Sequence, residues 1–262
     1  MDLTRYYTRL EQRQVAQGLL RTDGGDVDTP FDARDLARNF ERIALYDEYT
    51  LLGGRFVAQQ NESRLRRWET PIRVQPYFGE SVSLEQRAET TRELSAYVDR
   101  LAGITGAPLA MATGVANFHV LVLNVDEMAA SEELIKSLIP GVGRNTIEFI
   151  TTMPRFTMCS VNAFSEDDRY VAALVVIRAE HPALLRSSCI HEEIAQGLGL
   201  ANDSPTARPS IFNDDDEFAL LTAQDELMLN MLYDPRLSPG MTPSEARPMT
   251  KQIAAELLGE TS

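Results

Sequence analysis

The sequence predicts an α/β (α+β) domain built around a mixed β-sheet, and the order of its apolar patterns is the reason. Ile72–Phe78 alternates apolar and polar residues as a strand does, and a helical stripe of apolar residues follows Ser83. Phe156–Phe164 and Tyr170–Arg178 flank the turn sequence SEDDR, which favours a β-hairpin. A further helical pattern begins near Pro182. An order of strand, helix, several strands, helix, loop and helix is typical of an α/β layout.

Residues 1–64 are predicted to form a helical segment that packs on a main domain spanning residues 65–262. Thr29 is expected to cap the second of these helices, with Pro30 at its first position, where a missing amide hydrogen is tolerated. Two helices alone make a thin core. We therefore expect the segment to pack against the main body.

The first strand and helix of the main domain carry the clearest local signals. Pro76 suggests that the strand lies at an edge or carries a bulge, because proline cannot donate a ladder hydrogen bond. Ser83 with Gln86 forms a capping box for the helix, which Gly103 and Gly106 are expected to close. The remaining expected elements are strands at Leu109–Ala112 and Asn117–Asn124, a polar helical insertion at about 126–139, the hairpin, and helices at about Pro182–Leu200 and Thr222–Tyr233.

Acidic residues dominate the charge of the chain. Asp and Glu number 39 against 25 Lys and Arg, so the net charge is −14. An acidic surface repels phosphate groups, which argues against nucleic acid and against anionic membrane surfaces as partners. No apolar run approaches the roughly 18 residues that a bilayer-spanning helix needs, so we expect no transmembrane segment in this chain.

The most informative stretch is CIHEEIAQGLGLANDS, residues 189–204. A zinc-protease motif H-E-x-x-H starting at His191 fails, because Ala195 stands at the second histidine position. Aligned one residue later, the chain fits the offsets of the metzincin motif H-E-x-x-H-x-x-G-x-x-H with Glu192, Glu193, Gln196, Gly199 and Asn202. The segment thus resembles the active-site helix of metzincin metallopeptidases, with all three zinc histidines replaced.

This resemblance implies a role for each aligned residue. Glu193 takes the position of the general base, and Gly199 that of the glycine that turns the chain. Glu192, Gln196 and Asn202 take the positions of the metal ligands. Their oxygen donors suit Ca²⁺, Mg²⁺ or Mn²⁺ better than Zn²⁺. Helix geometry agrees, because Glu192 and Gln196 are four residues apart and share one face.

The same residues also have a plainer interpretation. Gln196 and Asn202 can bridge loop backbone in a polar network that Glu192 joins, and Glu193 can be a solvated acid lining a cleft. The chain has only three histidines, dispersed along the sequence, so an ordinary His₃ zinc site on this helix is excluded. His191 points about 100° away from Glu192, and a packed histidine near the helix start is its default interpretation.

A closer resemblance is to an uncharacterised family of proteobacterial proteins, several of which are described as candidate lipoproteins. Its signature reads like His191-Glu192-Glu193, Gln196, Gly199-Leu200, Asn202-Asp203-Ser204, Ser210–Asp214 (SIFND), Leu232–Leu237 (LYDPRL) and Gly240-Met241. The resemblance implies export to the cell envelope, in the periplasm or on a lipid anchor, with the export signal trimmed from this chain. It groups His191, Asp203, Asn213 and Asp214 with the cleft. The acidic run that starts at Asn213 lacks the EF-hand spacing and is interpreted as a turn.

Cys159 and Cys189 are the two cysteines of the chain. Together with the exported resemblance, an even cysteine count predicts that they form a disulfide. Such a bond would tether the start of the active-site-type helix to a strand of the sheet.

Three functions follow from these observations. We expect first a metzincin-like domain that binds a peptide or an envelope protein without a standard zinc centre. The second is an active metal-dependent peptidase with Glu193 as general base. The third is a structural envelope lipoprotein with a vestigial cleft. Chelator-sensitive peptide cleavage would separate the second from the other two.

Overall fold

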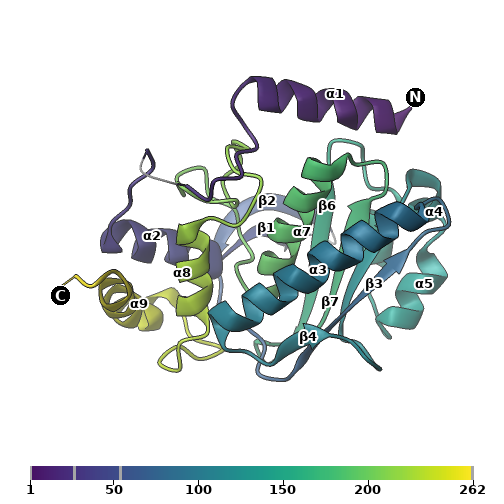
Figure 1. The fold of residues 1–262 in the computed structure, drawn as a ribbon. Helices are drawn as coiled ribbons and strands as arrows, with labels where there is room; N and C mark the ends of the chain where they lie inside the picture. Colours follow the sequence, from purple (N-terminus) through teal and green to yellow (C-terminus); the bar gives the residue numbers. More distant parts are fainter. Residues whose placement is uncertain (1, 26–27, 53–54, 261–262) are drawn as a thin grey trace.

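The computed structural model describes residues 2–25, 28–52 and 55–260, with the backbone alone at 47–52 and 55–60. Its five-stranded sheet has helices on both faces, and helix α1 lies across one end of the molecule (Figure 1). The helices are α1 (Leu3–Ala16), α2 (Ala33–Ala44), α3 (Leu84–Thr105), α4 (Val125–Ala129), α5 (Glu132–Leu138), α6 (Arg144–Thr151), α7 (Ala183–Leu198), α8 (Ala223–Leu232) and α9 (Pro243–Leu258). The strands are β1 (Tyr46–Leu52), β2 (Arg55–Glu62), β3 (Ile72–Phe78), β4 (Leu109–Met111), β5 (Phe118–Leu123), β6 (Cys159–Glu166) and β7 (Arg169–Arg178).

The larger sheet is mixed, as the sequence predicts. Its strands lie in the order β4-β3-β5-β7-β6. Strands β4, β3, β5 and β7 run parallel, and β6 runs antiparallel to β7 at one edge. Asp167 and Asp168 turn the chain between β6 and β7 with φ angles of 48° and 61°, the positive values that a two-residue hairpin turn requires. The predicted α/β class and the hairpin around SEDDR are confirmed.

Strand β7 is buried on both faces. Ala173, Val175 and Ile177 join the hydrophobic layer that contains α2, α3, α7, α8 and α9, whereas Leu174 and Val176 join the layer that contains α4, α5 and α6. A strand covered on both faces has no polar side, which explains why this part of the chain reads as a continuous apolar run.

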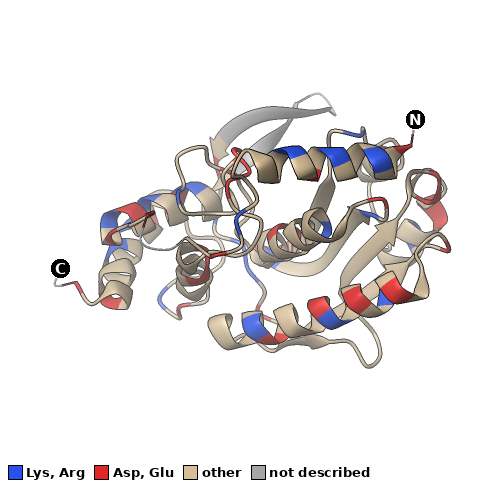
Figure 2. Cartoon of the chain, turned by 45° about the horizontal axis from the view of Figure 1, so that its top comes forward, with Lys and Arg blue, Asp and Glu red and all other residues tan. Residues whose placement is uncertain are grey.

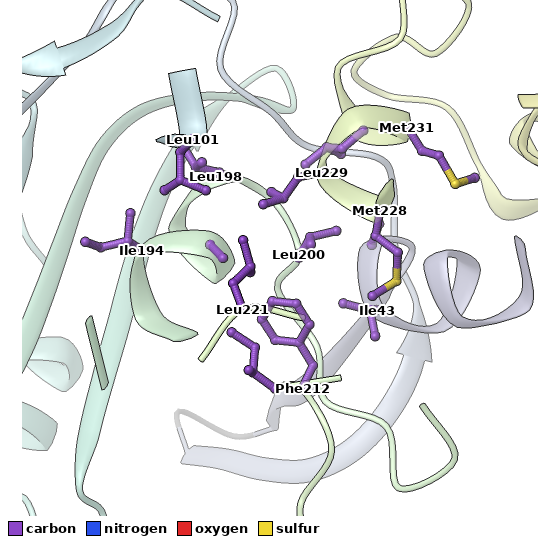
Figure 3. Packing of buried hydrophobic residues seen from close by; sticks show 14 of the residues in the cluster. Ile43, Leu101, Ile194, Leu198, Leu200, Phe212, Leu221, Met228, Leu229 and Met231 are labelled. Carbon is purple, nitrogen blue, oxygen red and sulfur yellow. The ribbon is translucent and has the colours of Figure 1, made fainter. Parts of the chain in front are cut away.

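The larger layer joins segments that are far apart in the sequence (Figure 3). Leu198 of α7 and Leu229 of α8 are fully buried there, together with Phe212 from the irregular stretch that follows α7. Ile43 of α2 belongs to the same cluster, so the N-terminal segment contributes to the core of the main domain.

Proline in β3 fits the observed topology. Strand β3 is second in the sheet, but β4 pairs only with Ile72–Val74, so Pro76 has a strand neighbour on one side only, β5. On the other side, the Pro76 carbonyl accepts a hydrogen bond of 3.1 Å from the side chain of Gln75. The missing amide hydrogen of proline is tolerated because no described strand needs it there.

The start of α2 differs from the expectation. Asp32, and not Thr29, is the N-cap, and its carboxylate accepts the backbone amides of Arg34 and Asp35. The side chain of Asp35 completes a capping box with the backbone amide of Asp32. A carboxylate at this position satisfies two otherwise unpaired helix amides, which explains why the helix begins after Pro30.

Tyr46–Leu52 and Arg55–Glu62 form the antiparallel pair β1 and β2, so the expectation of a helical segment extending to residue 64 is wrong there. Tyr46 lies opposite Glu62 in this pair. The sequence has β-prone residues on both sides of Gly53-Gly54, a dipeptide common in hairpin turns. The helical interpretation gave too little weight to that signal.

Helices α6 and α9 lie where the sequence pattern was not interpreted as helical. The N-cap of α9 is Thr242, which forms a capping box with Glu245 around a proline at the first helical position. Ile253 and Ala254 of α9 join the larger hydrophobic layer, against α2. Within the described part of the chain, no helix combines the length and the apolar character that crossing a bilayer requires.

Candidate functional site

Helix α7 carries the sequence-predicted site, and three interactions fix its position. Ile190 and Ile194 are fully buried in the larger hydrophobic layer. At the end of the helix, Trp68 donates a hydrogen bond of 2.9 Å from Nε1 to the carbonyl of Gly197, and Tyr233 donates one of 3.1 Å from its hydroxyl to the carbonyl of Leu198. Helix carbonyls near a C-terminus lack helical partners, so these two donors hold the last turn.

A disulfide ties the helix to the edge of the sheet. Cys189 of α7 and Cys159, the first residue of β6, are bonded, with their Cα atoms 5.9 Å apart. The predicted pairing is confirmed. Because Cys159 begins β6, the bond sets the middle of α7 beside the start of the edge strand.

Gly199 turns the chain immediately after the helix. Its φ angle is +132°, a conformation that residues with a side chain rarely adopt. A Cβ atom at this position would also collide with the carbonyl oxygen of Arg66 and lie 2.9 Å from a methyl group of Leu232. The turn therefore depends on glycine.

Glu192 and Glu193 lie together on the side of α7 that faces β6. One carboxylate oxygen of each and the Cys159 sulfur all lie within 4.8 Å of one another. Glu193 is only 5% exposed, and Glu192 is half-buried. The result is a pair of carboxylates next to the disulfide and the edge strand.

These three residues do not make a three-ligand zinc site while the disulfide is intact. Among the His, Cys, Asp and Glu side chains that the structure describes, they form the one group of three with metal-ligand spacing. Metal-binding cysteine acts as a thiolate, and the Cys159 sulfur is bonded to Cys189. Two carboxylates alone give fewer ligands than a structural or catalytic zinc site uses.

Gln196 and Asn202 each hold a different part of the chain. Gln196 Nε2 donates to Oδ1 of Asp203 at 3.0 Å. Asn202 is completely buried; its Nδ2 donates to the carbonyl of Arg42 at 2.7 Å, and its backbone amide donates to the carbonyl of Ile43 at 3.0 Å. The Gln196 side chain therefore ties the stretch after α7 to α7 itself. The Asn202 side chain ties the same stretch to the end of α2. Metal coordination by Glu192, Gln196 and Asn202 stays a prediction.

His191 is buried on a different flank of α7. Its Nδ1 accepts a hydrogen bond of 3.0 Å from the backbone amide of Leu221, and its ring stacks on Tyr97 with 4.0 Å between ring centroids. The hydroxyl of Tyr97 also donates to the His191 carbonyl at 2.8 Å. Burial, aided by nearby Arg100, lowers the pKa of His191 to about 3. The imidazole is thus neutral and positions the segment before α8.

The remaining predicted site residues lie along the stretch between α7 and α8. Asp203 accepts the Gln196 bond, and Asp214 is exposed. The side chain of Asn213 donates to the carbonyl of Ala207 at 2.8 Å and accepts the amide of Asp215 at 3.3 Å. These bonds make Asn213 an organiser of the turn.

Asp225 is the main residue that sequence reasoning missed. It is fully buried, and its carboxylate accepts bonds of 2.6 Å from the Ser210 hydroxyl, 3.1 Å from the Ile211 amide and 2.9 Å from the Thr222 amide. Burial raises the pKa of Asp225 to about 6, although the bonds that it accepts oppose this shift. The capping-box spacing of Thr222 and Asp225 was the available sequence signal.

A second buried histidine lies beneath α1 and touches the disulfide. Nδ1 of His181 is 3.7 Å from the Cys189 sulfur, and its ring meets the edge of Tyr7 at a centroid distance of 4.5 Å. Burial, together with Arg178 and Arg186, lowers the pKa of His181 to about 3. This histidine is packed and neutral.

Comparison with known protein families matches residues 33–252 to a family described as Protein of unknown function (DUF2927). The chain belongs to this family. The DUF2927 region begins at α2 and ends within α9, so it includes all of the residues of the α7 site and leaves α1 outside. Searches of curated proteins and of solved structures found no match to the chain. Membership of an uncharacterised family is confirmed, and the likeness to metzincins stays a prediction.

Proposed function

We propose that this DUF2927 protein is an exported, metzincin-like domain that binds an extended segment of a peptide or protein partner along strand β6. The observation that carries the proposal is the position of β6. It lies at the end of the sheet, and β7 is its one strand partner among the described residues. An edge strand presents unpaired backbone donors and acceptors, which an extended peptide can pair with as an added strand.

The surroundings of β6 support this site. Ser160 to Phe164 are only partly buried, and Glu192 and Glu193 lie at the start of the strand, beside Cys159. A peptide paired with the strand would pass this carboxylate pair. We therefore expect it to carry Lys or Arg at the position next to Cys159, because opposite charges across such a contact are favourable.

The metzincin comparison is supported by the order of elements. A mixed sheet precedes α7, an irregular stretch follows Gly199, and α8 comes next. Metzincins carry a methionine turn in the corresponding stretch, and this chain has the buried pair Ile211 and Phe212 there. We propose that this chain retains the metzincin fold and has lost the metzincin zinc ion.

The disulfide supports an exported location. A Cys159–Cys189 bond persists in oxidising compartments and is rare in the cytosol. We propose the periplasm, or a lipid-anchored position on the envelope membrane, as the place of action.

Selection from a random-sequence peptide display library, followed by amide hydrogen exchange, tests the proposal. The expected result is a peptide with a basic residue that slows exchange at β6 and leaves β4, the strand at the opposite edge, unchanged. Glu192→Gln should weaken this peptide about tenfold, as expected for the loss of one charge-assisted contact. Failure to select any peptide, or protection located elsewhere, would reject β6 as the binding edge.

One observation favours a second candidate, a hydrolase with Glu193 as general base. Glu193 is buried beside a second carboxylate, an arrangement also found in acid–base sites. Incubation of the full chain with a mixed peptide substrate, with and without a chelator, tests this candidate. Cleavage that stops with the chelator and in Glu193→Gln would favour the hydrolase over the binding domain.

A further inference from the structure

Helix α1 presents a row of arginines on its outer face. Arg5, Arg9 and Arg13 are all exposed, and together with Tyr6 and Asp2 they surround one shallow surface hollow. Residues four apart on a helix differ by about 40° around its axis, so the three arginines fall within about 80°. Figure 2 shows them as successive blue bands along the helix.

The opposite face of α1 is fixed to the body of the protein. Tyr7 is fully buried and donates a hydrogen bond of 2.7 Å to the carbonyl of Arg155, in the loop before β6. Glu11 accepts the backbone amide of Leu185 at 3.0 Å. Leu20 and Leu185 complete the small hydrophobic cluster beneath the helix. The arginine row is therefore held in one orientation.

The loop before β6 adds aromatic and basic groups next to this row. The guanidinium of Arg155 lies over the ring of Tyr6, 5.3 Å from its centroid. Phe156 follows directly and is 79% exposed, so its ring is open to contact from outside the protein. We use the name α1 face for this group of residues: Arg5, Tyr6, Arg9, Arg13, Arg155 and Phe156.

The charge of the α1 face is opposite to that of the chain as a whole. The net charge of the protein is −14, yet the nearest acid to this row is Asp2, 3.8 Å from Arg5. Glu11 is turned to the buried side, where it binds Leu185. At physiological ionic strength charges are screened over about 8 Å, so distant acids oppose an anion here only weakly.

We propose that the α1 face docks on the anionic phospholipid headgroups of a bilayer surface. Arginine binds phosphate through two parallel hydrogen bonds, and an exposed aromatic ring such as Phe156 suits the interfacial zone of a bilayer. Helix α1 lies across one end of the molecule (Figure 1), and its three arginines are exposed, so the row suits a flat partner. An acidic polypeptide would satisfy the arginines and leave Phe156 without a role.

Sedimentation of the full chain with lipid vesicles tests this proposal. Vesicles of phosphatidylcholine mixed with phosphatidylglycerol should bind the protein, vesicles of phosphatidylcholine alone should bind it far less, and added salt should reduce binding. Replacing Arg5, Arg9 and Arg13 by Gln should weaken binding by about 100-fold, from roughly tenfold or less for each charge at an anionic surface. Phe156→Ala should weaken it in addition.

The matched control replaces Arg34, Arg38 and Arg92 by Gln, three exposed arginines on α2 and α3. This variant changes the net charge equally and should bind as the original protein does. Equal loss in both triple variants would mean that net charge alone governs binding, which overturns the proposal. Absence of vesicle binding would also overturn the proposal. This includes the case in which the protein binds poly-glutamate, an acidic polypeptide, and no vesicles. Circular dichroism of each variant establishes that α1 remains folded.

Discussion

The side chain of Gln196 donates a hydrogen bond to Oδ1 of Asp203, seven residues further along the chain, at 3.0 Å. Asn202, the neighbour of Asp203, is held in turn by the backbone of α2. Two residues that occupy metal-ligand positions in the metzincin alignment therefore secure the chain after the Gly199 turn. This relationship favours a structural use of the replaced ligands.

Gln196→Ala should lower the free energy of unfolding by about 1 kcal/mol, the typical contribution of one hydrogen bond. Gln196→Glu should cost more, because it places a second carboxylate next to Asp203. Urea denaturation of both variants measures the effect. The reverse order, with Glu better tolerated than Ala, would argue that a cation lies between residues 196 and 203.

Gly199→Ala should destabilise the protein by at least about 1–3 kcal/mol, the usual cost of a strained backbone conformation, because φ is +132° and the new Cβ would collide with the carbonyl of Arg66. The control is Gly103→Ala in α3, where an added Cβ atom would have nothing within 4 Å. Alanine there should be neutral or stabilise the helix by about 0.5–1 kcal/mol. Thermal unfolding of the Gly199→Ala and Gly103→Ala variants measures both effects. Equal effects of the two substitutions would contradict the turn assigned to Gly199.

Replacement of both Cys159 and Cys189 by Ala should lower the free energy of unfolding by about 3–4 kcal/mol on the chain-entropy model, because the bond spans 30 residues. Chemical denaturation with and without reductant measures this. The original protein should lose stability on reduction, and the double variant should not respond. Two titratable thiols in unreduced, unfolded protein would show that the bond does not form.

Asp225 should make stability fall as the pH rises from about 4 to about 6. Its pKa is raised from 3.8 to about 6 in the folded protein, so the folded state binds the proton more tightly than the unfolded chain in this window. The loss across this window is about 2 kcal/mol, out of about 3 kcal/mol for the whole shift. The favourable contribution is complete well below pH 4 and is lost as the pH rises through 6.

The comparison of original protein with Asp225→Asn isolates this effect from other titrating groups. Their difference in the free energy of unfolding should change by about 2 kcal/mol between pH 4 and pH 6. The exposed control Asp214→Asn should leave the pH dependence of the original protein intact. A constant difference for Asp225→Asn across this window would contradict the assigned role of the carboxylate.

Much of the fold was predictable because its signals are local. Ser83 caps α3, as its spacing predicts, although the Gln86 side chain donates to the carbonyl of Ala179 and does not close the expected capping box. The SEDDR turn joins β6 to β7. The order of strands was not predictable, since it depends on which apolar faces meet across long crossovers. The β1–β2 pair was missed because helical periodicity was extended past Ala44, where α2 ends.

The site was predictable in its placement and less so in its contacts. The helical spacing predicted that Glu192 and Gln196 share one face of α7, but it could not show that Glu192 and Glu193 lie beside Cys159 of the edge strand. No local pattern could reveal that Asn202 binds the end of α2, because its partner Arg42 is 160 residues away. The hydrogen bonds to Asp225 could not be predicted for a related reason. The donor Ser210 lies in a segment without regular periodicity, so the sequence does not show that it approaches Asp225.

Elemental analysis of the undenatured protein after gel filtration decides whether α7 carries a zinc centre. No stoichiometric zinc is expected, because Gln196 and Asn202 supply amides where imidazoles are needed and the Cys159 sulfur is held in the disulfide. Glu193→Gln should leave the metal content unchanged. One zinc per chain, lost together with peptidase activity in Glu193→Gln or Gln196→Ala, would contradict the proposed binding domain and establish the hydrolase.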